Sequence, residues 1–114
     1  MHPGDRMSNT FVVVLVTFAS KPQAEKICAA LLEKRLIACA NVIGPVSSHF
    51  HWSGQIENAE EHIVLMKSRM DLLDKLVKCV KTLHTYEVPE ILALPIVGGS
   101  KGYLDWLSGV FEES

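Results

Sequence analysis

One short stretch of the chain gathers the side chains that are most capable of chemistry. It runs from His84 to Val97, and its first seven residues contain a histidine, a tyrosine and two carboxylates, namely His84, Tyr86, Glu87 and Glu90. The imidazole of His84 with the carboxylate of Glu87 or Glu90 could supply mixed nitrogen and oxygen ligands for a metal ion. The simpler interpretation is a histidine at a helix end beside a solvated pair of carboxylates.

Three other histidines belong to a long pair of strands. His49 and His51 alternate with aromatic residues and therefore share one strand face, where two imidazoles can reach one ion. His62 follows on the return strand and is expected near them. A solvated polar face explains the same pattern without a metal ion, and we favour that interpretation.

A second group of side chains could line a cleft that binds a small ligand. Its members are Cys39, Trp52, Lys67, Tyr86, Glu90 and Trp106. If Lys67 points into a cleft near Glu90, it can bind an anion or pair with that carboxylate. Against this, aromatic residues more often serve packing, and a lysine at a strand end often extends its charge to the surface.

Catalysis is not indicated by these residues. A nucleophilic site needs a nucleophile, a base and an orienting group, and Cys28, Cys39 and Cys79 have no histidine near them in sequence. Their odd number and apolar surroundings indicate reduced thiols in a cytoplasmic protein rather than a disulfide framework. We therefore predict a protein that is not an enzyme. A weaker alternative is a hydrolase that uses Glu87 or Glu90 as its base.

Composition restricts the class of protein. With 114 residues, 48% of them hydrophobic, and a net charge of −2, the chain is expected to form one domain with a real core. The charge disfavours nucleic-acid binding, and the longest apolar run, Phe11 to Val16, is too short to span a membrane. We expect residues 1–9 to be disordered and residues 10–114 to form the domain.

Hydrophobic periodicity predicts an α+β protein. The expected order is strand, helix, strand, strand, helix, strand and a short C-terminal helix, which is the ferredoxin-like βαββαβ arrangement. The expected segments are strands at 11–18, 36–52, 56–67 and 91–97, and helices from 21 to about 35, from about 69 to 83 and around 103–107. Gly44 and Pro45 predict a bulge or a bend in the second strand, and Ser68 with Asp71 predicts a helix cap.

The predicted hairpin between residues 36 and 67 is too long for a compact domain. Its arms of about 12–16 residues correspond to roughly 40–50 Å, whereas a domain of this size has a radius of gyration of about 13–14 Å. The tip, which carries Phe50, Trp52 and Ile56, must extend beyond the body. Because long apolar strands are a liability unless they are covered, we predict a homo-oligomer.

Four motifs of the chain closely resemble the CutA divalent-cation tolerance proteins. They are Ala38-Cys-Ala-Asn-Val42, Trp52-Ser-Gly-Gln-Ile-Glu57, His84-Thr-Tyr-Glu-Val-Pro-Glu-Ile91 and Gly102-Tyr-Leu-Asp-Trp106, and the resemblance extends from Phe11 to Phe111. It implies a ferredoxin-like fold and a cytoplasmic homotrimer with a shape similar to that of the PII signalling proteins. It also implies a role in tolerance of divalent metals, copper especially.

The resemblance also identifies candidate copper ligands. Those proposed in the family are a cysteine on the first strand and a His-His pair, and this chain has Val16, Leu83 and His84 at the three positions. We therefore expect a protein that binds or responds to metal ions, with His84 as the remaining candidate ligand. The alternative is a PII-like sensor or adaptor that binds a small anionic ligand in inter-subunit clefts and signals to an unidentified protein.

Overall fold

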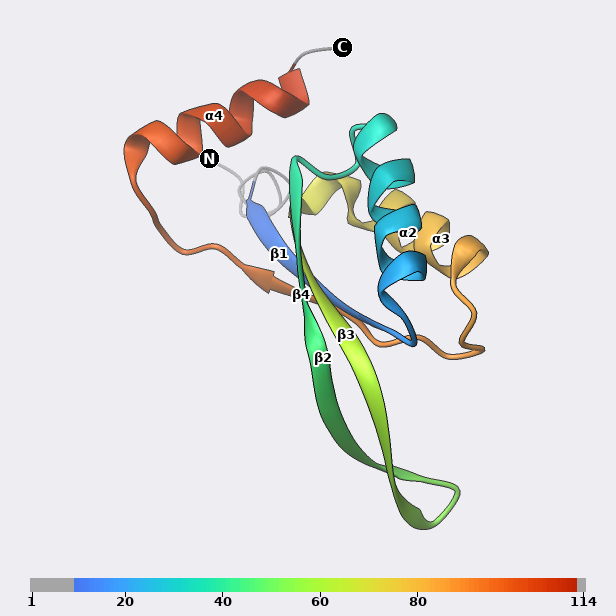
Figure 1. Cartoon of the computed structure of the whole chain (residues 1–114). Coiled ribbons are helices and arrows are strands. Elements are labelled where there is room, and N and C mark those ends of the chain that lie inside the picture. Colours follow the sequence, from blue (N-terminus) through green and yellow to red (C-terminus); the bar gives the residue numbers. More distant parts are fainter. Residues whose placement is uncertain (1–9, 113–114) are drawn as a thin grey trace.

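The computed structural model describes residues 10–112, which form four strands and three helices (Figure 1). In chain order these are β1 (Phe11–Phe18), α2 (Lys21–Glu33), β2 (Cys39–Trp52), β3 (Gln55–Arg69), α3 (Leu73–Leu83), β4 (Ile91–Pro95) and α4 (Lys101–Glu112), with one 3-10 turn (Met70–Leu72) before α3. The α+β class predicted from the sequence is confirmed. The expected disorder of residues 1–9 lies outside the described residues.

The strands form one antiparallel sheet with β1 near its middle. The strand order is β2-β3-β1-β4, and β1 pairs with β3 on one side and β4 on the other. Val14 lies opposite Met66 of β3 and Ala93 of β4. A strand in this position is flanked on both edges and apolar on both faces, which explains the unbroken apolar run from Phe11 to Val16 in β1.

One face of the sheet is covered by α2 and α3, which lie side by side on it (Figure 1). The even-numbered residues of β1 point to this face and are fully buried: Val12, Val14, Val16 and Phe18. Helix α2 presents Ala24, Ile27, Cys28 and Leu31 to the core, which is the predicted helical face. Its N-terminus is capped by Ser20, whose hydroxyl accepts a hydrogen bond from the backbone N–H of Gln23 at 3.3 Å.

The opposite face of the sheet, called here the open face, is apolar and only partly covered. It carries Val13 and Leu15 of β1, together with Leu92 and Leu94 of β4, which are 55% and 52% exposed. Helix α4 lies on this side and covers one end of the sheet, where Phe111 stacks on Phe11 with ring centroids 6.4 Å apart. Within the described chain, much of this apolar surface remains accessible to solvent.

The β2–β3 hairpin extends far from the rest of the sheet (Figure 1). The molecule is 47 Å long, and its radius of gyration of 15.2 Å exceeds the about 13–14 Å expected for a compact domain of this size. Ile56 at the tip is 75% exposed. The tip turn has positive φ at Ser53 and Gly54, the backbone pattern that two-residue hairpin loops require.

The predicted bulge lies in β2, where the register shifts between Ile43 and Val46. Gly44 has φ +151°, and a Cβ atom at this position would lie 2.8 Å from the ring of His62. Both the backbone conformation and the close approach therefore require glycine here.

Several local predictions need correction. Ser68 does not cap α3, because its hydroxyl donates instead to the Leu36 carbonyl at 2.6 Å, and Asp71 pairs with Arg69 at 2.6 Å. The helix begins without a side-chain cap, after a 3-10 turn. Strand β2 begins at Cys39 rather than at residue 36, β4 ends at Pro95 rather than at 97, and α4 is longer than predicted.

Among residues 10–112, the structure contains no helix that is both long enough and apolar enough to cross a membrane.

Candidate functional site

His84 stands at the end of α3 and is held on both sides of its ring. Its backbone N–H donates to the Val80 carbonyl at 2.8 Å, and its φ/ψ values of −76° and 146° end the helix. Nδ1 accepts a hydrogen bond from the Tyr86 backbone N–H at 3.0 Å. Nε2 lies 2.7 Å from the Thr17 carbonyl and must donate to it, because a carbonyl can only accept. The ring is therefore a neutral imidazole with its proton on Nε2.

Two aromatic rings pack against the ring of this hydrogen-bonded histidine. His84 stacks on Phe18 with centroids 4.7 Å apart and an interplanar angle of 13°, and Tyr86 packs against His84 with centroids 4.7 Å apart and an angle of 42°. The Tyr86 hydroxyl donates to the carboxylate of Glu61 at 2.7 Å. Glu61 is buried on β3, so this hydroxyl satisfies a carboxylate that is largely removed from water.

The Tyr86 hydroxyl is held in its protonated form by these surroundings. Burial, and then the hydrogen bond to Glu61 and its negative charge, raise the pKa of Tyr86 to about 12. At neutral pH the group is consequently a hydrogen-bond donor rather than a base or a metal ligand. The cluster of Phe18, His84, Tyr86 and Glu61 connects the end of α3 to β1 and β3.

This geometry bears directly on the predicted metal site. Both ring nitrogens of His84 are already engaged, so neither offers a free lone pair to a metal ion. Glu87 and Glu90 are exposed, and no group of three or more His, Cys, Asp or Glu side chains in residues 10–112 is arranged to hold an ion. The donor set around His84 does not fit a copper ion within one chain.

The histidines of the hairpin are separated by the strand register. His49 lies opposite Asn58 and His51 opposite Ile56, both exposed on β2. His62 is four residues beyond Asn58, which corresponds to about 13 Å along the strand. The structure therefore keeps His49 and His51 together on one face but does not bring His62 to them.

The residues predicted to line a ligand cleft fall at three places along β3. Trp52 lies at the hairpin tip opposite Gln55, Tyr86 reaches Glu61, and Lys67 lies opposite Cys39. Each of these positions on β3 is six residues from the next, or roughly 20 Å. Glu90 is exposed just before β4. Within one chain these side chains do not form a single cleft.

Part of the predicted set does meet at the end of the sheet beside α4. The Cys39 thiol lies 3.5 Å from the Tyr103 hydroxyl, and the Tyr103 and Trp106 rings pack with centroids 5.4 Å apart. Lys67 donates to the side-chain carbonyl of Asn41 on the neighbouring strand. The hydrogen bond with Cys39 raises the pKa of Tyr103. This group joins α4 to the open face.

The sequence interpretation missed Glu61, Asn41 and Tyr103, which complete these two groups. Glu61 could have been noticed as a carboxylate one residue away from the apolar run of β3. Its partner could not, because the contact to Tyr86 spans 25 residues of sequence.

All three cysteines are free thiols. Burial, with a smaller contribution from the charge of Glu25, raises the pKa of Cys28 to about 11. This thiol is therefore protonated and inert at neutral pH, as a core residue should be. Cys39 and Cys79 are only half-buried.

Comparison with known proteins finds a matching family and several relatives of this chain. Residues 12–110 match the family model described as CutA1 divalent ion tolerance protein. The divalent-cation tolerance protein CutA of Thermus thermophilus is 44% identical over 95 residues, which cover 83% of this chain and 92% of that protein. The chloroplastic protein CutA 1 of rice is 37% identical over 103 residues, or 90% of this chain, but the match spans only 58% of its own length.

Solved structures of CutA1 proteins have a fold similar to that of this chain. The crystal structure of CutA1 from rice superimposes with a TM-score of 0.87 and 35% identity, covering 95% of this chain and 99% of that chain. The likeness therefore includes the long hairpin and the helix-covered sheet described above.

Proposed function

This chain belongs to the CutA1 divalent ion tolerance family, and we propose that it acts in cellular tolerance of divalent cations such as copper. The observation that carries the proposal is the family match along almost all of the described residues. The proposed role is to bind or respond to the cation in the cytoplasm, without catalysing a reaction.

The assembly that we propose is a homotrimer of a ferredoxin-like subunit. The strand order β2-β3-β1-β4, with α2 and α3 on one face, supports the ferredoxin-like arrangement. The half-exposed leucines of the open face and the exposed apolar tip support an assembly, because contiguous apolar surface of this kind marks an interface. Three copies could cover one another's open faces and hairpins.

For the cation itself, the pair His49 and His51 fits better than His84. The two imidazoles lie on one exposed face of the hairpin, whereas the ring of His84 is committed to Thr17 and Tyr86. Further donors would have to come from water or from a neighbouring copy, since a copper site needs more than two ligands.

Growth in graded copper tests the function. In a strain that lacks its own CutA-type protein, expression of this chain should restore growth at copper concentrations that inhibit the empty-vector strain. Equal inhibition of both strains, with the protein present at normal abundance, would contradict the proposal.

Calorimetric titration with Cu²⁺ tests the location of the cation. The double variant His49→Asn/His51→Asn should lose most of the binding seen with the unaltered chain, and His62→Asn is the matched control on the same hairpin. Unchanged binding in the double variant would place the cation elsewhere.

A further inference from the structure

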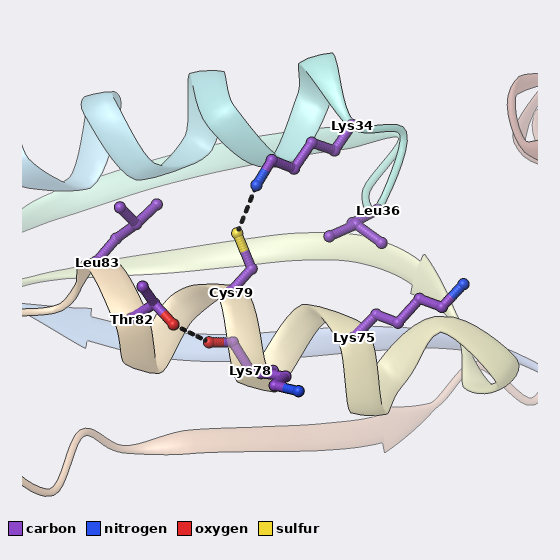
Figure 2. A pocket seen from close by; sticks show the side chains of 7 residues that line it. All are labelled: Lys34, Leu36, Lys75, Lys78, Cys79, Thr82 and Leu83. Carbon is purple, nitrogen blue, oxygen red and sulfur yellow. Dashed lines mark hydrogen bonds between the residues drawn. The ribbon is translucent and has the colours of Figure 1, made fainter.

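A concave pocket lies between α2 and α3 (Figure 2). These two helices cover the face of the sheet opposite the open face (Figure 1). Its volume is about 360 Å³, and it is lined by Lys34, Leu36, Lys75, Lys78, Cys79, Thr82 and Leu83. None of the residues discussed above as a candidate metal ligand or cleft residue lines it, apart from Leu83, which stands at a family ligand position but has no donor atom. The pocket is large enough to accommodate a small organic molecule.

The charges around this pocket are all of one sign. Lys34 comes from the C-terminal cap of α2, and Lys75 and Lys78 come from α3, three residues apart. No acidic residue lines the pocket. Within residues 10–112 none of these three lysines forms an ion pair with a carboxylate, although Asp71 and Asp74 precede Lys75 and Lys78 by four residues in the sequence.

Lys75 and Lys78 stand three residues apart on one helix, where like charges repel each other. Figure 2 shows the ammonium group of Lys34 beside Cys79, with those of Lys75 and Lys78 pointing in other directions. The whole chain nevertheless carries a net charge of −2, so the local excess of positive charge is not a general property of its surface. An anion in the pocket would relieve the repulsion. The alternative is that the lysines are simply solvated, with Lys34 favoured at the C-terminal end of the helix dipole.

The floor and one wall of the pocket are apolar. Leu36 is buried, Leu83 is 41% exposed, and the thiol of Cys79 lies at the centre with Nζ of Lys34 3.7 Å away. Figure 2 shows Lys34 reaching from α2 to Cys79, with Leu36 and Leu83 on either side of the thiol. An apolar wall beside ammonium groups suits a ligand that has both an anionic group and an organic part.

We propose that this pocket binds a small phosphate-bearing organic molecule. Lysine ammonium groups act as point charges with three donors each, and a phosphate group supplies multiple negative charges and several acceptor oxygens. The organic part of the ligand would lie against Leu36 and Leu83. This proposal does not depend on the role in cation tolerance, because the proposed cation ligands His49 and His51 do not line the pocket. The pocket also lies on the opposite side of the sheet from the surface proposed to form the trimer.

The first experiment is a calorimetric titration of the full chain with inorganic pyrophosphate at low ionic strength. Binding should saturate at one pyrophosphate per chain, and Lys34→Gln and Lys78→Gln should each weaken it at least fivefold. The matched control is Lys81→Gln, an exposed lysine of α3 that does not line the pocket, and it should change the affinity less than twofold. Absence of saturable binding, or equal weakening by Lys81→Gln, would overturn the proposal.

A second titration tests the apolar wall. Phenyl phosphate should bind at least threefold more tightly than inorganic phosphate, and Leu83→Ser should remove this difference while leaving phosphate binding unchanged. Equal affinities of the two ligands for the unaltered chain would overturn the inference that the ligand carries an organic part.

Protection of Cys79 tests the position of the ligand directly. Saturating pyrophosphate should slow alkylation of Cys79 by iodoacetamide several-fold, as followed by peptide mass spectrometry. Cys39, which is half-buried at the end of the sheet, is the internal control and should react at an unchanged rate. Unchanged alkylation of Cys79 would show that pyrophosphate binds elsewhere and would overturn the assignment.

Discussion

The two faces of the sheet are built from the same kinds of residue but are covered differently. Along β1, Val12, Val14 and Val16 are fully buried under α2 and α3, while Val13 and Leu15 between them are only half-buried. The edge strand β4 shows the contrast more strongly, because Leu92 and Leu94 are more than half exposed. Residues 10–112 thus cover one apolar face of the sheet and leave much of the other exposed.

The difference between the two faces allows the folding of one subunit to be distinguished from its proposed assembly with other copies. The covered face supplies the burial that stabilises one subunit, at roughly 25 cal/mol per Å² of apolar surface. The open face contributes fully only when a second surface removes it from water. Substitutions on the two faces should therefore change different measured quantities, and each prediction below tests that separation.

The largest effect is expected on the covered face. Val14→Asp would place a carboxylate where the side chain is fully buried, and the desolvation of that charge costs several kcal/mol, comparable with the total stability of a small domain. The variant should show no cooperative thermal transition by circular dichroism. A cooperative transition within a few degrees of that of the unaltered chain would contradict the central placement of β1.

The corresponding change on the open face should spare the fold and affect the assembly. Leu94→Asp, at a half-exposed position, should retain the circular dichroism spectrum of the unaltered chain. Light scattering should give three times the 12.6 kDa of one chain for the unaltered protein and a single-chain mass for the variant. An unaltered protein of single-chain mass would refute the proposed trimer.

A third effect is expected at the corner where α3 returns to the sheet. His84→Ala removes a ring that is stacked on Phe18 and leaves the Thr17 carbonyl without its donor. The free energy of unfolding should fall by about 2–3 kcal/mol in urea titrations. His51→Ala on the exposed hairpin face is the matched control and should cost less than about 0.5 kcal/mol. Equal effects of the two changes would show that His84 has no structural role.

The neighbouring tyrosine should have a smaller and pH-dependent effect. Tyr86→Phe leaves the buried Glu61 carboxylate without its donor, which should cost about 1–2 kcal/mol at pH 7. Because folding raises the pKa of Tyr86 from about 10 to about 12, the folded state favours the protonated hydroxyl. This contribution is complete below pH 10 and is lost as the pH rises towards 12.

This pH dependence can be measured by comparing the melting temperatures of the unaltered chain and of Tyr86→Phe. Between pH 10 and 12 the melting temperature of the unaltered chain should fall more steeply than that of Tyr86→Phe, so the difference between them should narrow. A difference that stays constant over this range would show that the hydroxyl does not titrate as inferred. The thiol of Cys28 titrates in the same range but is common to both proteins.

The smallest effect is expected on α4. Lys101 and Asp105 form an ion pair at 2.6 Å, but their side chains are 89% and 64% exposed. Lys101→Ala should therefore change the free energy of unfolding by less than about 0.5 kcal/mol, and 1 M salt should abolish the difference. A loss of more than 1 kcal/mol would indicate that α4 contributes more to the subunit than its exposure suggests.

Much of the fold could be predicted from the sequence because its signals are local. The continuous apolar run in β1, the helical spacing in α2 and the bulge at Gly44 all depend on residues close together in the chain. The helix cap predicted at Ser68 was wrong because the hydrogen bond of this side chain is not local. Its hydroxyl bonds to Leu36, which is 32 residues away, and no local pattern records that contact.

The candidate site was less predictable from sequence. His84 and Tyr86 were identified by their types and spacing, but what they do depends on Thr17 and Glu61, which are contributed by two other strands. A histidine that binds metal and one that joins two elements look the same in sequence. Only the partners of its two nitrogens separate these roles, and both partners here belong to the protein itself.

The position of β1 has a consequence for the synthesis of the chain. This strand is made before its two neighbours, which end at Arg69 and Pro95. At about 5–20 residues per second, about 4–15 s pass between the synthesis of Phe18 and that of Pro95. Throughout that time an eight-residue apolar segment has at least one unpaired edge. We therefore expect β1 to be the segment of the nascent chain that most needs protection by a chaperone before the sheet closes.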